Sequence, residues 1–239
     1  MMTADFILSE LTSAGTEEKA KHLSRFFKTG KGEYGEGDCF LGVIVPMTRS
    51  IAKANLQTPF EELQKLLDSK WHEARLCSLL ILVERTKKKK LCSEEERERI
   101  FQFYLKNARR CNNWDLVDLS CPQLVGQYLL SRGDRSWLFQ LAESDNLWEQ
   151  RIAIVSTIAF IRQGFFDETF HLAKQLMNHP HDLIHKATGW MLREVGKQDK
   201  AALTEFLETY ATRLPRTTLR YAIEKYPEPE RLYFLNKKE

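Results

Sequence analysis

The stretch Trp71-His-Glu-Ala-Arg-Leu76 begins a helical segment, and similar stretches follow at Trp148-Glu-Gln-Arg-Ile152 and Ile184-His-Lys-Ala187. In each of them a basic residue stands early in a helix and is followed by an apolar run that can face a core. A pattern that returns along a chain of helices is typical of repeat proteins, in which one structural unit stacks on the next. The returning stretches therefore indicate a repeat protein built from helices.

The spacing of the basic residues gives the length of the repeat. Arg75 and Arg151 lie 76 positions apart, which divides into two steps of 38, and the steps to Lys186 and Arg220 are 35 and 34. Steps of this length match helix-pair solenoids of the HEAT or tetratricopeptide class, and the Trp, Leu-Gly and Tyr pattern of the tetratricopeptide class is absent. We therefore predict an all-α, HEAT-like repeat α-solenoid, with helix pairs stacked into a curved superhelix.

Composition and local patterns agree with a helical chain. Gly (11) and Pro (7) are scarce among the 239 residues, and no stretch shows the alternation of a strand. We expect a single HEAT-like repeat domain over residues 1–239, with one helix opening at Pro46, because proline suits a first turn. The other expected helices cover residues 3–14, 16–28, 58–68, 71–86, 94–107, 114–130, 134–143, 147–163, 166–178, 182–197, 199–209, 215–226 and 228–236.

Nothing in the sequence predicts export or membrane insertion. The first residues lack the basic and apolar regions of a signal peptide, and no window approaches 18 apolar residues without a charge. Five cysteines form an odd set without a CxxC pair, which favours reduced thiols and argues against a zinc site. We therefore expect a cytoplasmic protein without a metal.

The modest net charge of +3 conceals a regular arrangement of cations. If the second helices of stacked pairs line one concave wall, the basic repeat positions form a stripe along it, which suits the phosphate backbone of duplex DNA. The alternative is that each cation forms a salt bridge within its own repeat. The stripe consists of Arg75, Arg151, Lys186 and Arg220, and neighbouring turns add Arg162, Arg193 with Lys197, and Lys225.

One repeat position breaks the stripe. Asn113-Trp-Asp115 stands there, and Asp118 follows Trp114 at i+4, so ring and carboxylate share a helix face. An acid in such a groove repels phosphates, which makes sense if a positive charge must be stabilised there. The alternative is a half-buried indole beside acids that favour a helix start. Trp190 lies one turn after Lys186 and can face the same groove, although core packing is the ordinary role of an indole.

A glycine-rich stretch precedes the repeats. Gly30-x-Gly32-x-x-Gly35 matches the dinucleotide-binding pattern, but no apolar strand precedes it and three nearby acids would repel a pyrophosphate. We interpret residues 29–38 as a loop with Tyr34 at its tip, before a segment that returns to the core.

At four stretches the sequence resembles the AlkD-like family of DNA alkylation-repair glycosylases, which are HEAT-like repeat proteins with a concave basic surface that holds DNA. The stretches are Tyr34-Gly-Glu-Gly-Asp-Cys-Phe-Leu-Gly42, Trp114-Asp-Leu-Val-Asp118, Ser144-Asp-Asn-Leu-Trp-Glu-Gln-Arg151 and Lys186-Ala-Thr-Gly-Trp-Met-Leu-Arg-Glu194. They lie in the family's order. The last three are quite specific, whereas the loop is characteristic of only part of the family.

The resemblance implies a monofunctional glycosylase that hydrolyses the N-glycosidic bond of cationic N3-methyladenine and N7-methylguanine in duplex DNA. Asp118 matches the catalytic acid, which would stabilise an oxocarbenium-like sugar and orient water. Trp114 and Trp190 match the indoles that hold the sugar and the lesion. Arg151 matches a phosphate-binding arginine, and Arg193 is expected to help. The family is thought to act without extruding the base, in contrast to most glycosylases.

This chain departs from the family in two places. The family often has two consecutive tryptophans where Asn113-Trp114 stands here, and the aromatic residue that contacts the lesion from the N-terminal helices would be Tyr34 or Phe40. We expect a monomer that needs neither metal nor organic cofactor and is associated with the nucleoid while it acts. Two alternatives remain: a non-catalytic HEAT-like module that binds branched or damaged DNA, and a solenoid scaffold that binds acidic peptides.

Overall fold

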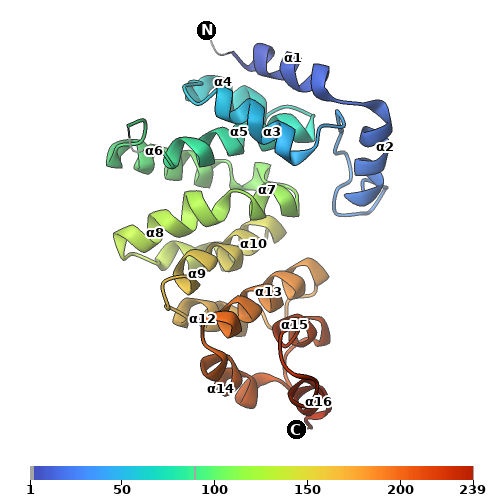
Figure 1. The fold of residues 1–239 in the computed structure, drawn as a ribbon, viewed down its shortest axis with the longest axis vertical. Helices are drawn as coiled ribbons and strands as arrows, with labels where there is room; N and C mark the ends of the chain where they lie inside the picture. The colour runs from blue at the N-terminus through green and yellow to red at the C-terminus, as the bar shows by residue number, and fades with distance from the viewer. Residues whose placement is uncertain (1–2, 89, 239) are drawn as a thin grey trace. The chain divides into compact units, whose positions relative to one another are not determined.

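The computed structural model describes residues 3–88 and 90–238, and within them it contains helices and no strand. An isolated bridge between Cys39 and Trp71 is the one β-type contact in these ranges. The prediction of an all-α helical-repeat fold is therefore confirmed (Figure 1). The helices of the first half are α1 (Ala4–Ala14), α2 (Glu17–Phe26), α3 (Val45–Ala54), α4 (Phe60–Leu67), α5 (His72–Thr86), α6 (Glu94–Lys106) and α7 (Trp114–Asp118). Those of the second half are α8 (Gln127–Arg132), α9 (Ser136–Ala142), α10 (Leu147–Ser156), α11 (Ile158–Ile161), α12 (Asp167–Gln175), α13 (Asp182–Gln198), α14 (Lys200–Tyr210), α15 (Arg216–Ala222) and α16 (Glu228–Asn236).

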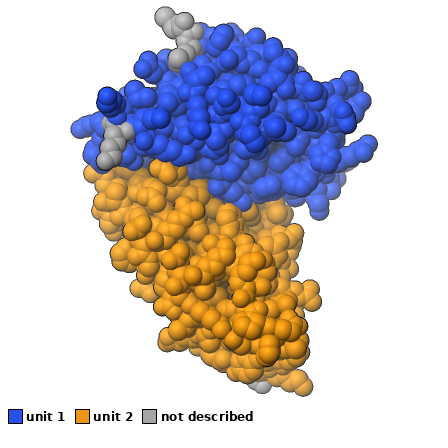
Figure 2. All heavy atoms as spheres, in the orientation of Figure 1, with its two compact units in different colours: residues 1–120 blue, residues 121–239 orange. Residues whose placement is uncertain are grey.

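The chain forms two compact units, residues 1–120 and 121–239 (Figure 2). Each unit has its own buried apolar core. The expectation of one domain over residues 1–239 stays a prediction.

Helix α5 is the centre of the first unit. All 15 of its residues are buried, and α3 and α4 pack against it. A helix that is buried on every side must satisfy its polar groups within the protein, because water cannot reach them. Five buried residues of α5 have acidic or basic side chains, and two of them organise the site described below. They are His72, Glu73, Arg75, Glu84 and Arg85.

The second unit repeats one packing arrangement. Helix α10 packs against α9 and α13, and α13 packs against α12, α14 and α15. The helices α10, α13 and α15 are therefore neighbours in this order, as expected for the second helices of stacked pairs. Gly189 allows α13 to pack closely on α15, because a Cβ atom there would lie 2.5 Å from the Cβ of Tyr221 and 2.6 Å from the carbonyl oxygen of Thr218.

One expected helix is interrupted. Instead of a single helix over residues 114–130, α7 ends at Asp118, a π-helical turn covers Pro122–Gly126, and α8 follows. Proline has no N–H to continue the hydrogen-bond ladder, and its ring clashes with the preceding turn. The expected helix over 147–163 is likewise divided into α10 and α11.

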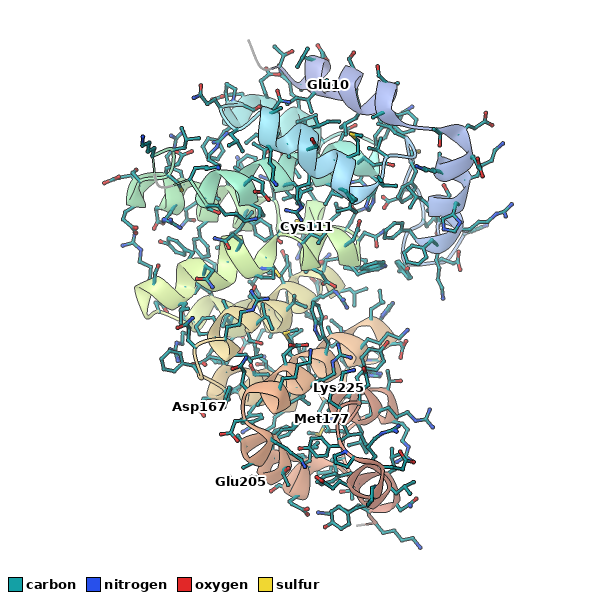
Figure 3. The ribbon with its side chains drawn as sticks, viewed as in Figure 1. Glu10, Cys111, Asp167, Met177, Glu205 and Lys225 are labelled. Atoms are coloured by element: carbon teal, nitrogen blue, oxygen red, sulfur yellow. The ribbon has the colours of Figure 1, made fainter. Side chains whose placement is uncertain are left out.

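All five cysteines are free thiols, and Cys111 lies in the interior of the first unit (Figure 3). Burial raises the pKa of the Cys77 and Cys111 thiols to about 12, so both stay protonated at neutral pH. In the described ranges no helix is long and apolar enough to cross a membrane.

Candidate active site

Helix α7 holds Trp114 at its first position and Asp118 at its last. The helix begins at Trp114 because the side-chain oxygen of buried Asn113 accepts a hydrogen bond from the Trp114 N–H at 2.9 Å. Trp114 and Asp118 line the same pocket, and both are half-buried. The predicted sharing of one face by this indole and this carboxylate is therefore observed.

Aromatic contacts fix the Trp114 ring. Phe27 stacks on it with ring centroids 5.1 Å apart, and Phe26 meets it edge-on at 5.8 Å. The indole N–H donates a hydrogen bond to the Tyr34 hydroxyl oxygen, at 3.3 Å. The loop over residues 29–38 thus reaches the candidate site through Tyr34.

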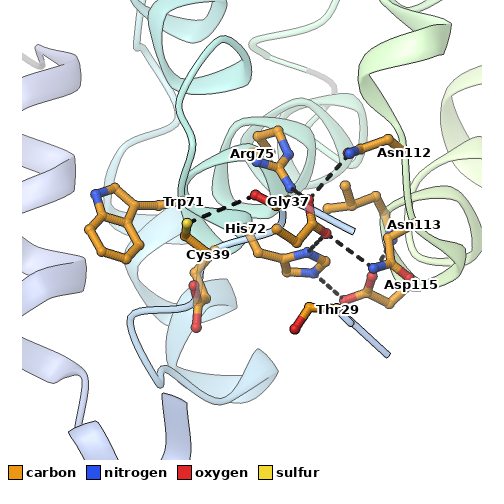
Figure 4. Close-up of polar contacts among 12 residues, drawn as sticks. Thr29, Gly37, Cys39, Trp71, His72, Arg75, Asn112, Asn113 and Asp115 are labelled. Atoms are coloured by element: carbon orange, nitrogen blue, oxygen red, sulfur yellow. Dashed lines mark hydrogen bonds and ion pairs between the residues drawn. The ribbon is translucent and has the colours of Figure 1, made fainter. Parts of the chain in front are cut away.

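A buried histidine beneath the site joins two carboxylates (Figure 4). Nδ1 of His72 lies 3.2 Å from Asp38, and Nε2 lies 2.8 Å from Asp115. Burial opposes a charged ring, but the charges and hydrogen bonds of Asp115 and Asp38 outweigh it and raise the pKa of His72 to about 9. His72 is therefore an imidazolium at neutral pH and donates to both acids.

Asp38 accepts further hydrogen bonds on the other side of this network. Arg75 donates to it at 2.6 Å, and the side chains of Asn112 and Asn113 donate at 3.2 Å each. Burial alone would raise the pKa of Asp38, but the His72 hydrogen bond and the positive charge of Arg75 lower it below its ordinary value. The carboxylate of Asp38 therefore links the end of the loop, α5 and the start of α7.

These contacts assign Arg75 to the interior of the unit. Its side chain is buried, and it also donates to the carbonyl oxygen of Ser69 at 2.9 Å. A guanidinium held in this way cannot reach a phosphate without breaking a buried ion pair. Arg75 therefore forms a salt bridge, as the alternative considered from the sequence expected, but its partner Asp38 lies in a distant loop and not within the same repeat.

The two acids of α7 have different environments. Asp115 is buried and bound to His72, whereas Asp118 is half-buried and lines the pocket. A carboxylate bound to a buried imidazolium serves structure, and one at an open pocket can meet a substrate. The structure therefore holds Asp115 within a buried network and leaves Asp118 at the pocket, where a bound molecule can reach it.

A second buried acid shapes the wall of the pocket. The two carboxylate oxygens of Glu73 accept the backbone N–H groups of Leu41, Gly42 and Val43 at 2.9, 2.8 and 3.1 Å. Without Glu73 these N–H groups would be buried without partners, at a considerable cost in stability. Glu73 thus holds the segment over residues 40–46 against α5.

The pocket lies within the first unit. It has a volume of about 440 Å³ and is bounded by α2, the segment over residues 40–46, α5 and α7. Its lining is mostly apolar and aromatic, with the acid Asp118 among the polar groups. A concave apolar pocket with a few polar groups is the usual form of a small-molecule site.

The other sequence-predicted residues belong to the second unit. Arg151, Lys186 and Arg220 lie on the neighbouring helices α10, α13 and α15. Arg151 and Lys186 both lie near the start of α13. Burial lowers the pKa of His181, which precedes this helix, and the charge of Asp182 raises it. The positive charges of Arg151 and Lys186 lower it further. Arg220 is exposed.

Most of these cations have partners. Buried Arg151 donates to the Leu183 carbonyl oxygen, and Lys186 pairs with Asp182 at 2.7 Å on the surface. An exposed pair of this kind contributes little to stability, so a phosphate can compete for Lys186. Further along α13, the Trp190 indole N–H donates to Glu194 at 3.1 Å. Lys197 also pairs with Glu194, and Arg193 pairs with Glu224 of the segment that follows α15.

Three groups that shape the site were not identified from the sequence. His72 and Glu73 stand in the quoted repeat stretch, whose pattern predicts a helix and no partner for either side chain, and Phe27 is one of many apolar residues in an amphipathic segment. Glu73 and His72 act at long range, on residues about 30 to 40 positions away in the chain. The available signal was the unusual presence of His-Glu at the start of an otherwise apolar helix.

The fold and the pocket together define a helical-repeat protein whose candidate active site combines an indole with a carboxylate. The sequence model of the DNA alkylation repair enzyme family matches residues 7–226, and the chain belongs to this family. Its role is accordingly in the repair of alkylated DNA, with DNA as its partner.

A solved structure has a similar fold. A predicted DNA alkylation repair enzyme from Enterococcus faecalis matches with a TM-score of 0.67 and 17% sequence identity, over 90% of this chain and 97% of that one. At this identity the likeness shows the fold alone. A search of curated proteins found no significant match.

Proposed function

We propose that the protein is a monofunctional DNA glycosylase that releases N3-methyladenine and N7-methylguanine from duplex DNA. These bases carry a positive charge and leave easily. As the bond between the sugar C1′ and the base nitrogen breaks, its electron pair neutralises the base, and positive charge develops on the sugar. The carboxylate of Asp118 stabilises that charge and orients the water that attacks C1′.

The observation that carries the proposal is the separation of the two acids on α7. Asp115 is bound to His72, while Asp118 lines a pocket together with Trp114, whose ring is fixed by Phe27. A fixed indole favours a cationic centre through its π-face, and a nearby carboxylate adds charge stabilisation. Trp190 is proposed as the second indole, as the family resemblance implies.

Cations of the second unit bind the DNA backbone in this proposal. The phosphates are contacted by cations of α13 and α15, namely Lys186, Arg193, Lys197 and Arg220. Arg151 of the neighbouring helix α10 assists them. The protein acts as a monomer on DNA that carries alkylated bases. No metal or organic cofactor takes part in the proposed steps.

The direct test is release of the free base from methylated duplex DNA, measured by chromatography. Replacement of Asp118 by Asn should lower the rate by about 10²- to 10³-fold, as found when other electrostatic stabilisers are removed. Binding of the same DNA, measured by fluorescence anisotropy, should change little. Asp167→Asn, which alters an exposed aspartate of α12, is the matched control and should leave the rate unchanged.

Two results would contradict the proposal. DNA binding without release of either base would favour the non-catalytic module. Release at the same rate by the wild-type protein and the Asp118→Asn variant would remove Asp118 from the chemistry.

A further inference from the structure

His72 lies where three distant segments of the first unit meet. Its ring nitrogens lie 3.2 Å from Asp38, at the end of the glycine-rich loop, and 2.8 Å from Asp115 of α7 (Figure 4). The face of the ring stacks on Phe40, in the chain that follows the loop, with ring centroids 4.6 Å apart. Only 2% of His72 is exposed, so protein atoms enclose its side chain.

One route leads from this ring to Asp118 through α7. Helix α7 has five residues, so it contains few hydrogen bonds of its own and its position depends on what its side chains contact. Asp115 provides such a contact, because one of its carboxylate oxygens accepts the Leu116 N–H at 2.8 Å and the other faces His72. Asp118 is the last residue of the same helix. A shift of Asp115 therefore shifts Asp118 as well.

A second route leads to Trp114 through stacked rings. The His72 ring lies 5.0 Å from the ring of Phe27, and Phe27 stacks on Trp114 at 5.1 Å. Phe27 also stacks on Phe40 at 5.2 Å. Phe27 and Phe40 are buried in a closely packed interior, so neither ring can move without disturbing its neighbours. The same imidazole thus supports both the indole and the carboxylate that line the pocket.

The arrangement requires a positive charge on His72. Both ring nitrogens face carboxylates, and only the protonated ring can donate a hydrogen bond to each of them. Loss of the proton turns a nitrogen lone pair toward an acid, and that contact becomes repulsive. Of the other charged groups nearby, Arg75 is bound to Asp38, and Glu73 holds backbone N–H groups. Asp118 lines the same pocket as the ring.

We propose that His72 is a positioning residue for base release, whose imidazolium holds Trp114 and Asp118 in the arrangement that the reaction requires. This role rests on the proposed glycosylase function and involves no contact between His72 and DNA. A catalytic group that is displaced by about 1 Å can lose on the order of 10²-fold in rate. Loss of the imidazolium should therefore slow the chemical step. The affinity for DNA should remain, because the cations proposed to bind phosphates belong to the second unit.

Two amides separate the contacts of the ring. In His72→Gln the NH₂ group can replace Nε2 and donate to Asp115, whereas in His72→Asn it can replace Nδ1 and donate to Asp38. Single-turnover release from methylated duplex at saturating protein measures the chemical step, and fluorescence anisotropy measures Kd. At pH 7 we expect His72→Asn to slow release by at least about tenfold. His72→Gln should slow it less, because the contact with Asp115 leads to Asp118.

The control separates this effect from a general effect of losing a histidine. Neither amide should change Kd by more than about twofold. His171→Asn alters an exposed histidine of α12 and should change neither the rate nor Kd. Circular dichroism verifies that each variant is folded. If His72→Asn does not fold, the pH profile of the wild type and of His72→Gln decides.

The pH profile of release tests the charge on the ring. Burial opposes protonation, but Asp115 and Asp38 raise the pKa of His72 to about 9. The wild-type rate at saturating protein should therefore be level from about pH 7 to 8 and fall as the pH passes 9. His72→Gln has no such proton to lose and should lack this fall. Alkaline damage to the methylated base affects both proteins alike, and circular dichroism at each pH separates the fall from unfolding.

The outcomes distinguish the positioning role from the function on which it rests. Release by folded His72→Asn at the wild-type rate, or the same alkaline fall in His72→Gln, overturns the role and leaves the glycosylase function intact. Release of neither base by the wild type rejects the function. The emission of Trp114, taken as the difference between proteins with and without Trp114→Phe, then still reports the support of the indole. It should change near pH 9 with His72 and not with Gln at this position, and equal behaviour of the two would reject the positioning as well.

Discussion

Nε2 of His72 lies 2.8 Å from a carboxylate oxygen of Asp115 and thereby joins the first turn of α5 to the first turn of α7. The other ring nitrogen faces Asp38 at 3.2 Å. Both nitrogens can donate only when the ring is protonated, so the geometry itself calls for an imidazolium. The position of α7, and with it that of Trp114 and Asp118, thus depends on a charged residue that is distant in the sequence.

We expect the free energy of unfolding to fall as the pH rises from about 6.5 to 9. The pKa of His72 is 6.5 in an unfolded chain and about 9 in the folded protein, so the folded protein binds more protons in this window. The stabilisation is complete below pH 6.5 and is lost as the pH passes through 9. Its full size is on the order of 3 kcal/mol, at about 1.4 kcal/mol per pKa unit.

Urea unfolding of the wild type and of His72→Gln at several pH values measures this contribution. The two proteins should differ most near pH 6.5 and become more alike toward pH 9. A difference that stays constant over the window would mean that His72 is not charged.

Replacement of Glu73 by Gln should destabilise the first unit by about 2–4 kcal/mol. The amide keeps one acceptor oxygen but turns an NH₂ group toward backbone N–H groups that now bind a carboxylate. The measurement is again urea unfolding. Glu36→Gln is the control, since exposed Glu36 accepts one N–H, that of Gly32, and its loss should cost less than about 1 kcal/mol. Equal effects of the two variants would contradict the structural role of Glu73.

Replacement of Arg220 by Ala should weaken binding to duplex DNA. It should also make the slope of log K against log salt concentration shallower by about one unit, which corresponds to one lost phosphate contact. Arg220 is exposed on α15 and is proposed to face the DNA backbone. Titrations by fluorescence anisotropy at several salt concentrations give the slope. Arg213→Ala, which removes another exposed arginine of the same unit, should leave the slope unchanged. Identical slopes for all three proteins would exclude Arg220 from the interface.

Replacement of Gly189 by Ala should destabilise the second unit by about 1–3 kcal/mol, as expected for overpacking. The added Cβ would meet the backbone of Thr218 and the Cβ of Tyr221, neither of which can move freely. Gly196→Ala on the same helix is the control, because its Cβ would meet only the side chain of Leu203, whose terminal methyl group can turn aside more readily than backbone atoms can. Thermal unfolding should therefore show a clear loss for Gly189→Ala and little change or a gain for Gly196→Ala.

The features that the sequence predicted are those set by local periodicity and spacing. The repeat steps from Arg151 to Lys186 and Arg220 predict helices that prove to be neighbours. The i, i+4 spacing of Trp114 and Asp118 predicts a shared helix face, and in the structure both residues line one pocket. The burial of Arg75 and its ion pair with Asp38 could not be predicted. The same residue type can reach solvent or bind Asp38, and the choice depends on where a distant loop returns.

Long-range contacts explain the remaining differences. The partners of His72 lie 34 and 43 positions away, on segments whose meeting no local pattern specifies. The interruption of the helix after Asp118 is a different case. It is a local effect of Pro122, and the expected single helix over residues 114–130 was wrong.

The loop over residues 29–38 supplies its own anions. The carboxylates of Glu33 and Glu36 accept the N–H groups of Gly30 and Gly32 at 2.9 and 2.7 Å, which are the groups that a phosphate would otherwise bind. Its conformation is thus encoded within the loop, and Tyr34 and Asp38 connect it to the site. Residues 30–37 can therefore vary in sequence as long as Tyr34, which accepts the hydrogen bond of Trp114, is kept. Such variation can diversify the surface beside Trp114 while Asp118 stays in place, provided that Gly35 is also kept, where a Cβ would lie 2.4 Å from the Phe27 carbonyl oxygen.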